Sequence, residues 1–306
     1  MLYHPPQPIE ARVWTTMPDE FRRTGARPAW AEANKPGQTC DSFLEGPSFD
    51  RDGNLWVVDI PFGRVFRISP NGEWALVAEY DGWPNGLKIL PDGRILIADY
   101  ARGIVEVDPV TGQMTPRLTH RHSEGFRGCN DLFIAADDAV YFTDQGQSGL
   151  HMPNGRVFRW DMAADRLDLL IDTGPSPNGL VMDLEEERLL VAMTRDNAVW
   201  RLPIMPDGTV SKVGRFIQLS GGLAGPDGMA LDADGGLWVA DAGHGSVWGF
   251  SALGVPLWRV QAPAGLTTTN VAFHPDRPQI CITQSDRGEV LVADVPVAGK
   301  PMASHR

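Results

Sequence analysis

The sequence predicts an all-β protein, a six-bladed β-propeller whose ring is closed by a strand from the N-terminal region. One observation is a unit that recurs six times at intervals of 40 to 49 residues. A second is the order within each unit: a polar residue, a short apolar strand, a turn and a nearly continuous apolar run. The third is the lack of convincing helical periodicity, since the best candidate, "RWDMAADRLDLLID", alternates with period two. Units of this length and order are typical of four-stranded propeller blades.

Each unit opens on a polar residue, here called an anchor. We expect one domain over residues 1–306, with blades that begin near residues 44, 84, 129, 177, 226 and 269. The first strand of a blade lines the central channel, so the anchors should converge at one mouth of that channel. The six anchors are Glu45, Asn85, Asn130, Asn178, Asp227 and Asn270.

The remaining elements follow in chain order. The second strands, such as "LWVVD" at 55–59, are apolar at consecutive positions, which indicates burial on both faces between neighbouring blades. The last unit stops after "EVLVADV" at 289–295 with only three strands, and this would leave a free edge. We therefore expect the segment around 11–17 to pair there and close the ring. Residues 18–43 are rich in Pro and Gly without a strand pattern, so they should form a long loop over one mouth.

Composition excludes several classes of function. The chain has 306 residues and a formal net charge of −12, which argues against nucleic acid or an anionic membrane as a partner. The three cysteines form no disulfide or metal pattern. No signal peptide or long apolar run is present, so a cytoplasmic location is expected. Nothing in the sequence specifies an oligomeric state.

The chemistry of the anchors indicates a metal site. Two carboxylates and four amides supply only hard oxygen donors, which suit Ca²⁺, Mg²⁺ or Mn²⁺. Two carboxylates match the charge of a divalent ion, and buried carboxylates without a cation would be costly. Asn and Asp also begin strands simply as turn residues, and for any single anchor that reading is preferred. The joint pattern, and Glu45 in particular, favours the metal.

Four motifs, "EGP" at 45–47, "GCND" at 128–131, "PNG" at 177–179 and "GPDGM" at 225–229, resemble those of the gluconolactonase/regucalcin/luciferin-regenerating-enzyme family of six-bladed propellers. That family includes drug-responsive lactonases and diisopropyl-fluorophosphatase. The resemblance implies one divalent ion, with Ca²⁺ ahead of Mg²⁺, Mn²⁺ or Zn²⁺, and a small-molecule lactone as substrate. Its ligands would be Glu45, Asn130, Asn178 and Asp227.

The expected reaction is metal-dependent lactone hydrolysis. The ion would polarise the carbonyl, and either a water at the ion or an Asp carboxylate would attack. Asp227 is the first candidate for the base or nucleophile, and Asp131 is the second, with the alternative that it only orients Asn130. The expected substrate-binding residues are Asn85, Arg127, Trp83, His151 and Asn270.

Two other functions stay open at this point. One is hydrolysis of phosphorus–fluorine organophosphates at the same site. The other is a propeller that binds a ligand without turnover. Hydrolysis assays on a series of lactones with metal-stripped and metal-reloaded protein would separate these from the lactonase.

Overall fold

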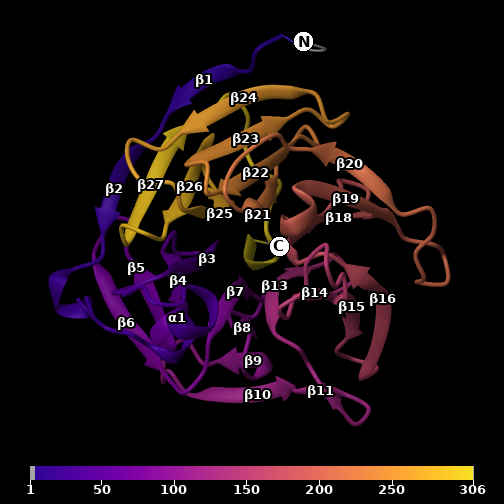
Figure 1. Ribbon diagram of the computed structural model, residues 1–306, viewed down its shortest axis with the longest axis horizontal. Helices are drawn as coiled ribbons and strands as arrows, with labels where there is room; N and C mark the ends of the chain where they lie inside the picture. The colour runs from indigo at the N-terminus through magenta and orange to yellow at the C-terminus, as the bar shows by residue number, and fades with distance from the viewer. Residues whose placement is uncertain (1–3, 306) are drawn as a thin grey trace.

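The computed structural model, which describes residues 4–305, confirms a six-bladed β-propeller (Figure 1). Six sheets surround a central axis, and the innermost strand of each blade contacts that of the next, with the sixth against the first. These inner strands are β3 (Leu44–Phe49), β7 (Pro84–Ile89), β13 (Cys129–Ile134), β17 (Pro177–Met182), β21 (Gly225–Leu231) and β25 (Thr268–Phe273).

Outside each inner strand, antiparallel strands complete the blade. The first three blades add β4 (Leu55–Asp59), β5 (Arg64–Ile68) and β6 (Trp74–Glu79); β8 (Ile95–Asp99), β9 (Gly103–Val107) and β10 (Met114–Leu118); and β14 (Val140–Asp144), β15 (Gly155–Asp161) and β16 (Arg166–Gly174). The last three add β18 (Arg188–Met193), β19 (Ala198–Pro203) and β20 (Gly214–Gln218); β22 (Leu237–Ala242), β23 (Ser246–Phe250) and β24 (Pro256–Gln261); and β26 (Gln279–Gln284) with β27 (Glu289–Asp294).

The N-terminal segment closes the ring, as expected. Strand β2 (Arg12–Thr16) pairs antiparallel with β27, with Val13 opposite Leu291, and so supplies the missing fourth strand of the last blade. The preceding strand β1 (Gln7–Glu10) was not expected. It pairs parallel with β24, the outer strand of the fifth blade. Residues 7–16 therefore tie the last two blades together and cover both of their outer edges.

Burial between blades explains the consecutive apolar positions of the second strands. All five residues of β4 and of β8 are buried. Between the first two blades, Val58, Leu87 and Ile97 belong to one core cluster. The aspartates that end these strands hold the backbone at the start of the inner strands: Asp99 Oδ1 accepts the Trp83 N–H at 3.1 Å. Similar bonds join Asp59 to Phe43 and Asp144 to Gly128.

The segment 18–43 is not wholly a loop. It contains a 3₁₀ turn, η1 (Asp19–Phe21), and a six-residue helix, α1 (Ala29–Asn34), which packs against η2 (Ile60–Phe62). A helix this short spans fewer than two turns, so no apolar periodicity could reveal it. Two further short features precede β13 and β19: a hairpin of β11 (His120–Arg121) and β12 (Glu124–Gly125), and η3 (Thr194–Asp196).

Residues 295–305, which follow β27, run to the centre of the propeller (Figure 1). The Lys300 N–H donates to the Leu231 carbonyl, and Ser304 Oγ donates to the Phe49 carbonyl at 2.8 Å, close to η4 (Ala303–His305). Both acceptors lie at the far ends of inner strands, so this tail closes one end of the channel. Among residues 4–305, no helix is both long and apolar enough to cross a bilayer.

Candidate active site

Every inner strand has a register irregularity at its anchor. The pairing of β3 with β4 shifts between Glu45 and Ser48, and that of β13 with β14 shifts between Cys129 and Leu132. The other four inner pairs shift at the corresponding place. Such bulges bend a strand and redirect its side chains, and they are common beside active sites. Here six of them surround one mouth of the channel.

The anchors converge, as predicted. Five of them are buried, and Asp227 is half-buried. The Asn270 amide nitrogen donates to Glu45 Oε2 at 2.8 Å and to Asp131 Oδ2 at 3.4 Å, so groups from the sixth, first and third blades meet at the axis. We call the six anchors and Asp131 the channel ring.

Glycine makes this narrow ring possible. In four blades the residue after the anchor is glycine, and a Cβ on Gly86 would lie 2.3 Å from Asp131 Oδ1. A Cβ on Gly228 would lie 1.9 Å from the Asn270 side chain. In the third blade the residue after the anchor is Asp131. Its carboxylate occupies space that stays open in the four blades with glycine at this position.

The carboxylates of the ring repel one another. Burial, together with the negative charge of Asp131, raises the pKa of Glu45 to about 7. Burial and the charges of Glu45 and Asp131 raise the pKa of Asp227 well above its ordinary value. A cation lies beside one of them: Lys88 Nζ is 3.6 Å from Asp131 Oδ1. The ring therefore carries more negative than positive charge and favours either a proton or a cation.

Hydrogen bonds to residues outside the ring orient two of the ring amides. Asn130 Nδ2 donates to Gln145 Oε1 at 3.1 Å, and Asn178 Nδ2 donates to Thr194 Oγ1 at 3.2 Å. The Thr194 hydroxyl in turn donates to the Pro226 carbonyl at 2.8 Å, so it can only accept from Asn178. With their nitrogens engaged, both amides keep their carbonyl oxygens as ligand atoms.

This donor set fits a hard divalent cation, because it combines carboxylate and amide oxygens without sulfur or imidazole. Within the described part of the chain, no three His, Cys, Asp or Glu side chains lie close enough together to form a metal cluster by themselves. An ion at the ring would therefore depend on the oxygens of Asn130 and Asn178 as well as on Glu45 and Asp227.

The residues expected to bind substrate lie in different surroundings. Asn85 is buried in the ring, and Asn270 is engaged with the ring carboxylates. Trp83 is half-buried, with its ring 5.9 Å from that of Tyr100. Arg127 is exposed and donates to the Asn154 carbonyl, and His151 is exposed on the loop after β14. Trp83, Arg127 and His151 thus lie on connections at the mouth, outside the ring.

Two charged residues near the ring were not predicted from the sequence. Lys88 lies in the apolar stretch "GLKIL". A charged residue inside an otherwise buried strand was the sequence feature that could have indicated its role. Arg195 is exposed in η3, and its charge opposes the rise in the pKa of Asp227. No sequence signal marks Arg195, because its nearness to Asp227 depends on the packing of neighbouring blades.

The raised pKa of Glu45 predicts an unusual pH dependence of stability in chelator-treated protein. The folded state holds this proton more tightly than the unfolded state, so its contribution is present below pH 4.5 and is lost as the pH rises through about 7. The loss should approach about 3 kcal/mol for the unfolding free energy. Urea unfolding between pH 5 and 8 measures it, with Glu45→Gln as the control in which the decline should be shallower, since Asp227 still titrates there. Equal slopes for parent and variant would contradict the assignment.

Comparison with known proteins gives a consistent set of relatives. A family model described as the SMP-30/Gluconolactonase/LRE-like region matches residues 43–286. The chain is 31% identical to a gluconolactonase of Zymomonas mobilis over 265 residues, which cover 76% of this chain and 73% of the relative. It is 28% identical to lactonase drp35 of Staphylococcus aureus over 282 residues, or 87% and 84% of the two chains. The crystal structure of regucalcin from Agrobacterium tumefaciens, described as a calcium-binding protein, covers 99% of both chains with a TM-score of 0.77 and 21% identity.

Proposed function

The chain belongs to the SMP-30/gluconolactonase/LRE-like family, and from that membership we propose that it is a divalent-metal-dependent lactone hydrolase whose active site is the channel ring. The relatives named gluconolactonase and lactonase support the reaction class. The main support for the site is the all-oxygen ring, in which burial and then mutual repulsion raise the pKa of Glu45 and Asp227. Such an arrangement is costly unless a cation compensates it.

The ligands we propose are Glu45, Asn130, Asn178 and Asp227, with Ca²⁺ as the preferred ion. A divalent cation held there would supply Lewis-acid polarisation of the lactone carbonyl. Ca²⁺ takes six to eight oxygens, so four protein ligands leave positions open for small molecules.

Asp227 is our candidate for the general base. Residue 227 is half-buried whereas Glu45 and Asp131 are buried, so Asp227 is the most exposed of the three acidic ring residues. It would accept a proton from the water that attacks the carbonyl carbon, and the departing ring oxygen would then take up a proton, which gives a hydroxy acid.

Asp131 is better suited to positioning than to proton transfer. Its Oδ1 accepts the Leu132 N–H at 2.8 Å and lies beside the Lys88 ammonium, while its Oδ2 receives the Asn270 amide. Donors therefore surround both oxygens of this carboxylate. We propose that it holds Asn270, and through it Glu45, in place.

Substrate would bind above the ring. Trp83 and Tyr100 offer an apolar wall there, and Gln147 joins that wall to α1 through hydrogen bonds to the Tyr100 hydroxyl at 2.8 Å and to Asn34 at 3.3 Å. Asn85, Arg127 and His151 remain candidates for contacts with polar groups of the lactone. An apolar wall with few polar groups is typical of small-molecule sites.

A substrate series tests the proposal. Metal-reloaded protein should hydrolyse at least one class among sugar lactones and aliphatic γ- and δ-lactones, as measured by acid release with a pH indicator. A phosphorus–fluorine ester in the same series tests the organophosphate alternative. The matched control is Glu45→Gln/Asp227→Asn, which removes both ligand charges. No turnover of any lactone by protein with verified metal content would leave a non-catalytic binding propeller instead.

A further inference from the structure

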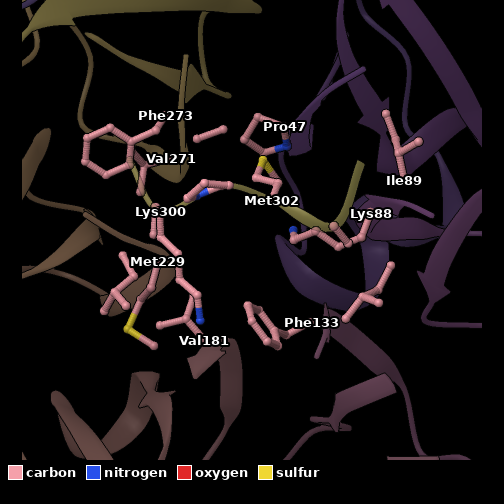
Figure 2. Close-up of a pocket in the computed structure, with 16 residues that line it drawn as sticks. Pro47, Lys88, Ile89, Phe133, Val181, Met229, Val271, Phe273, Lys300 and Met302 are labelled. Carbon is pink, nitrogen blue, oxygen red and sulfur yellow. The ribbon is translucent and has the colours of Figure 1, made fainter. Parts of the chain in front are cut away.

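Lys88, a lysine in the channel below the ring, has no part in the proposed reaction. Lys88 lies three residues after the anchor of β7, and its ammonium donates to the Leu87 carbonyl at 3.1 Å besides facing Asp131. Its side chain is only 16% exposed. Figure 2 shows it reaching into the lower channel near Pro47, Phe133 and Met302.

Apart from the carboxylates of Asp131 and Glu45, this ammonium has mainly apolar surroundings. It borders a cavity of about 70 Å³ that the C-terminal tail closes with Pro301, Met302 and Ala303. The residues at the same position in the other five inner strands are all uncharged: Ser48, Phe133, Val181, Ala230 and Phe273. The propeller fold therefore does not require a lysine at the third position after the anchor. Its specific partner is Asp131, the carboxylate that replaces glycine in the third blade.

The formal charges suggest what this pair does. Glu45, Asp131 and Asp227 supply three negative charges around the axis, and Lys88 supplies one positive charge in contact with Asp131. The remaining two match a single divalent ion. We propose that Lys88 is a built-in counter-cation that neutralises Asp131, keeps it out of the ligand set and so sets the affinity of the ring for its metal. This inference rests on the proposed metal site.

Removing the lysine charge should strengthen metal binding. In Lys88→Met, the ring would present three negative charges to the ion without the lysine charge beside Asp131. A unit charge beside a ring carboxylate changes the electrostatic free energy of a divalent ion held by the ring, even at high effective dielectric. We expect Ca²⁺ to bind at least about tenfold more tightly than in the parent, measured by calorimetric titration of the full-length protein. A purely structural role for Lys88 would predict weaker binding.

Two matched variants complete the design. Lys300 lines the same cavity, but its ammonium bonds to Glu186 Oε1 at 3.1 Å, so Lys300→Met should leave the Ca²⁺ affinity unchanged. The double variant Lys88→Met/Asp131→Asn removes both charges of the pair and should return the affinity close to that of the parent. Circular dichroism in Ca²⁺-containing buffer checks the fold of each protein.

Each outcome decides the question. Unchanged or weaker Ca²⁺ binding by folded Lys88→Met overturns the role of Lys88 and leaves the metal site intact. If Lys88→Met does not fold but the double variant does, the lysine is needed only because of Asp131, which supports the proposal. Failure of both to fold overturns it, since packing would then explain the residue. A parent that binds no divalent ion overturns the proposed function, and the role of Lys88 in metal affinity with it.

Discussion

Removal of divalent metal should abolish lactone hydrolysis while the propeller stays folded. The loss should be complete to the limit of detection, because the ring would then contain carboxylates that hold protons or repel one another instead of a Lewis acid. Dialysis against a chelator, followed by elemental analysis and the pH-indicator assay, measures it. Addition of Ca²⁺, Mg²⁺, Mn²⁺ or Zn²⁺ in turn should restore turnover, with Ca²⁺ the most effective.

The fold should survive because apolar packing between blades supplies most of its stability. The core clusters lie between neighbouring sheets, and none of them includes a ring residue. The far-ultraviolet spectrum of stripped protein should therefore match that of the loaded protein. Full activity in protein shown to be free of metal would disprove the mechanism, and a collapsed spectrum would show that the ion is structural.

The architecture was predictable from the sequence because the repeat occurs six times at blade spacing and its last unit lacks one strand. Anchors recur at blade spacing, and three strands in the last unit imply that another segment must cover its edge. The segment that covers it is β2. Strand β1 was not predictable, because the four residues that pair in parallel with β24 show no alternation that separates a strand from a loop. Helix α1 was not predictable either, because it is too short to show periodicity.

The composition of the ring was also predictable, but its contacts were not. Convergence of the anchors follows from propeller geometry alone. The hydrogen bond between Asn270 and Asp131 joins residues 139 apart in sequence, and it depends on glycines that let the inner strands approach. The inward orientation of Lys88 was not predicted, because a lysine in a strand ordinarily indicates a solvent-facing position. Only the fold shows that its ammonium turns inward to a buried carboxylate.

The two proposed roles of Asp227, ligand and base, can be separated by replacing it with asparagine. Asp227→Asn preserves volume and one oxygen, but it removes a negative charge and a carboxylate able to accept a proton. Metal affinity should fall because the ring loses charge. At saturating metal, kcat should still be lower by about 10²–10⁴-fold, the usual contribution of a general base.

Glu45→Gln is the matched control for that experiment, because it removes the same charge from the same ring. Glu45 Oε2 accepts the Gly46 N–H at 2.7 Å and the Asn270 amide at 2.8 Å, so glutamine can keep an oxygen there while it loses the charge. We assign Glu45 no proton transfer, so this variant should recover much more of its kcat once metal is saturating. Elemental analysis must show equal occupancy in both proteins. If fully loaded Asp227→Asn turns over like the parent, Asp227 is a ligand only. Proton transfer would then fall to Asp131 or to solvent, and Asp131→Asn would show which of the two accepts the proton.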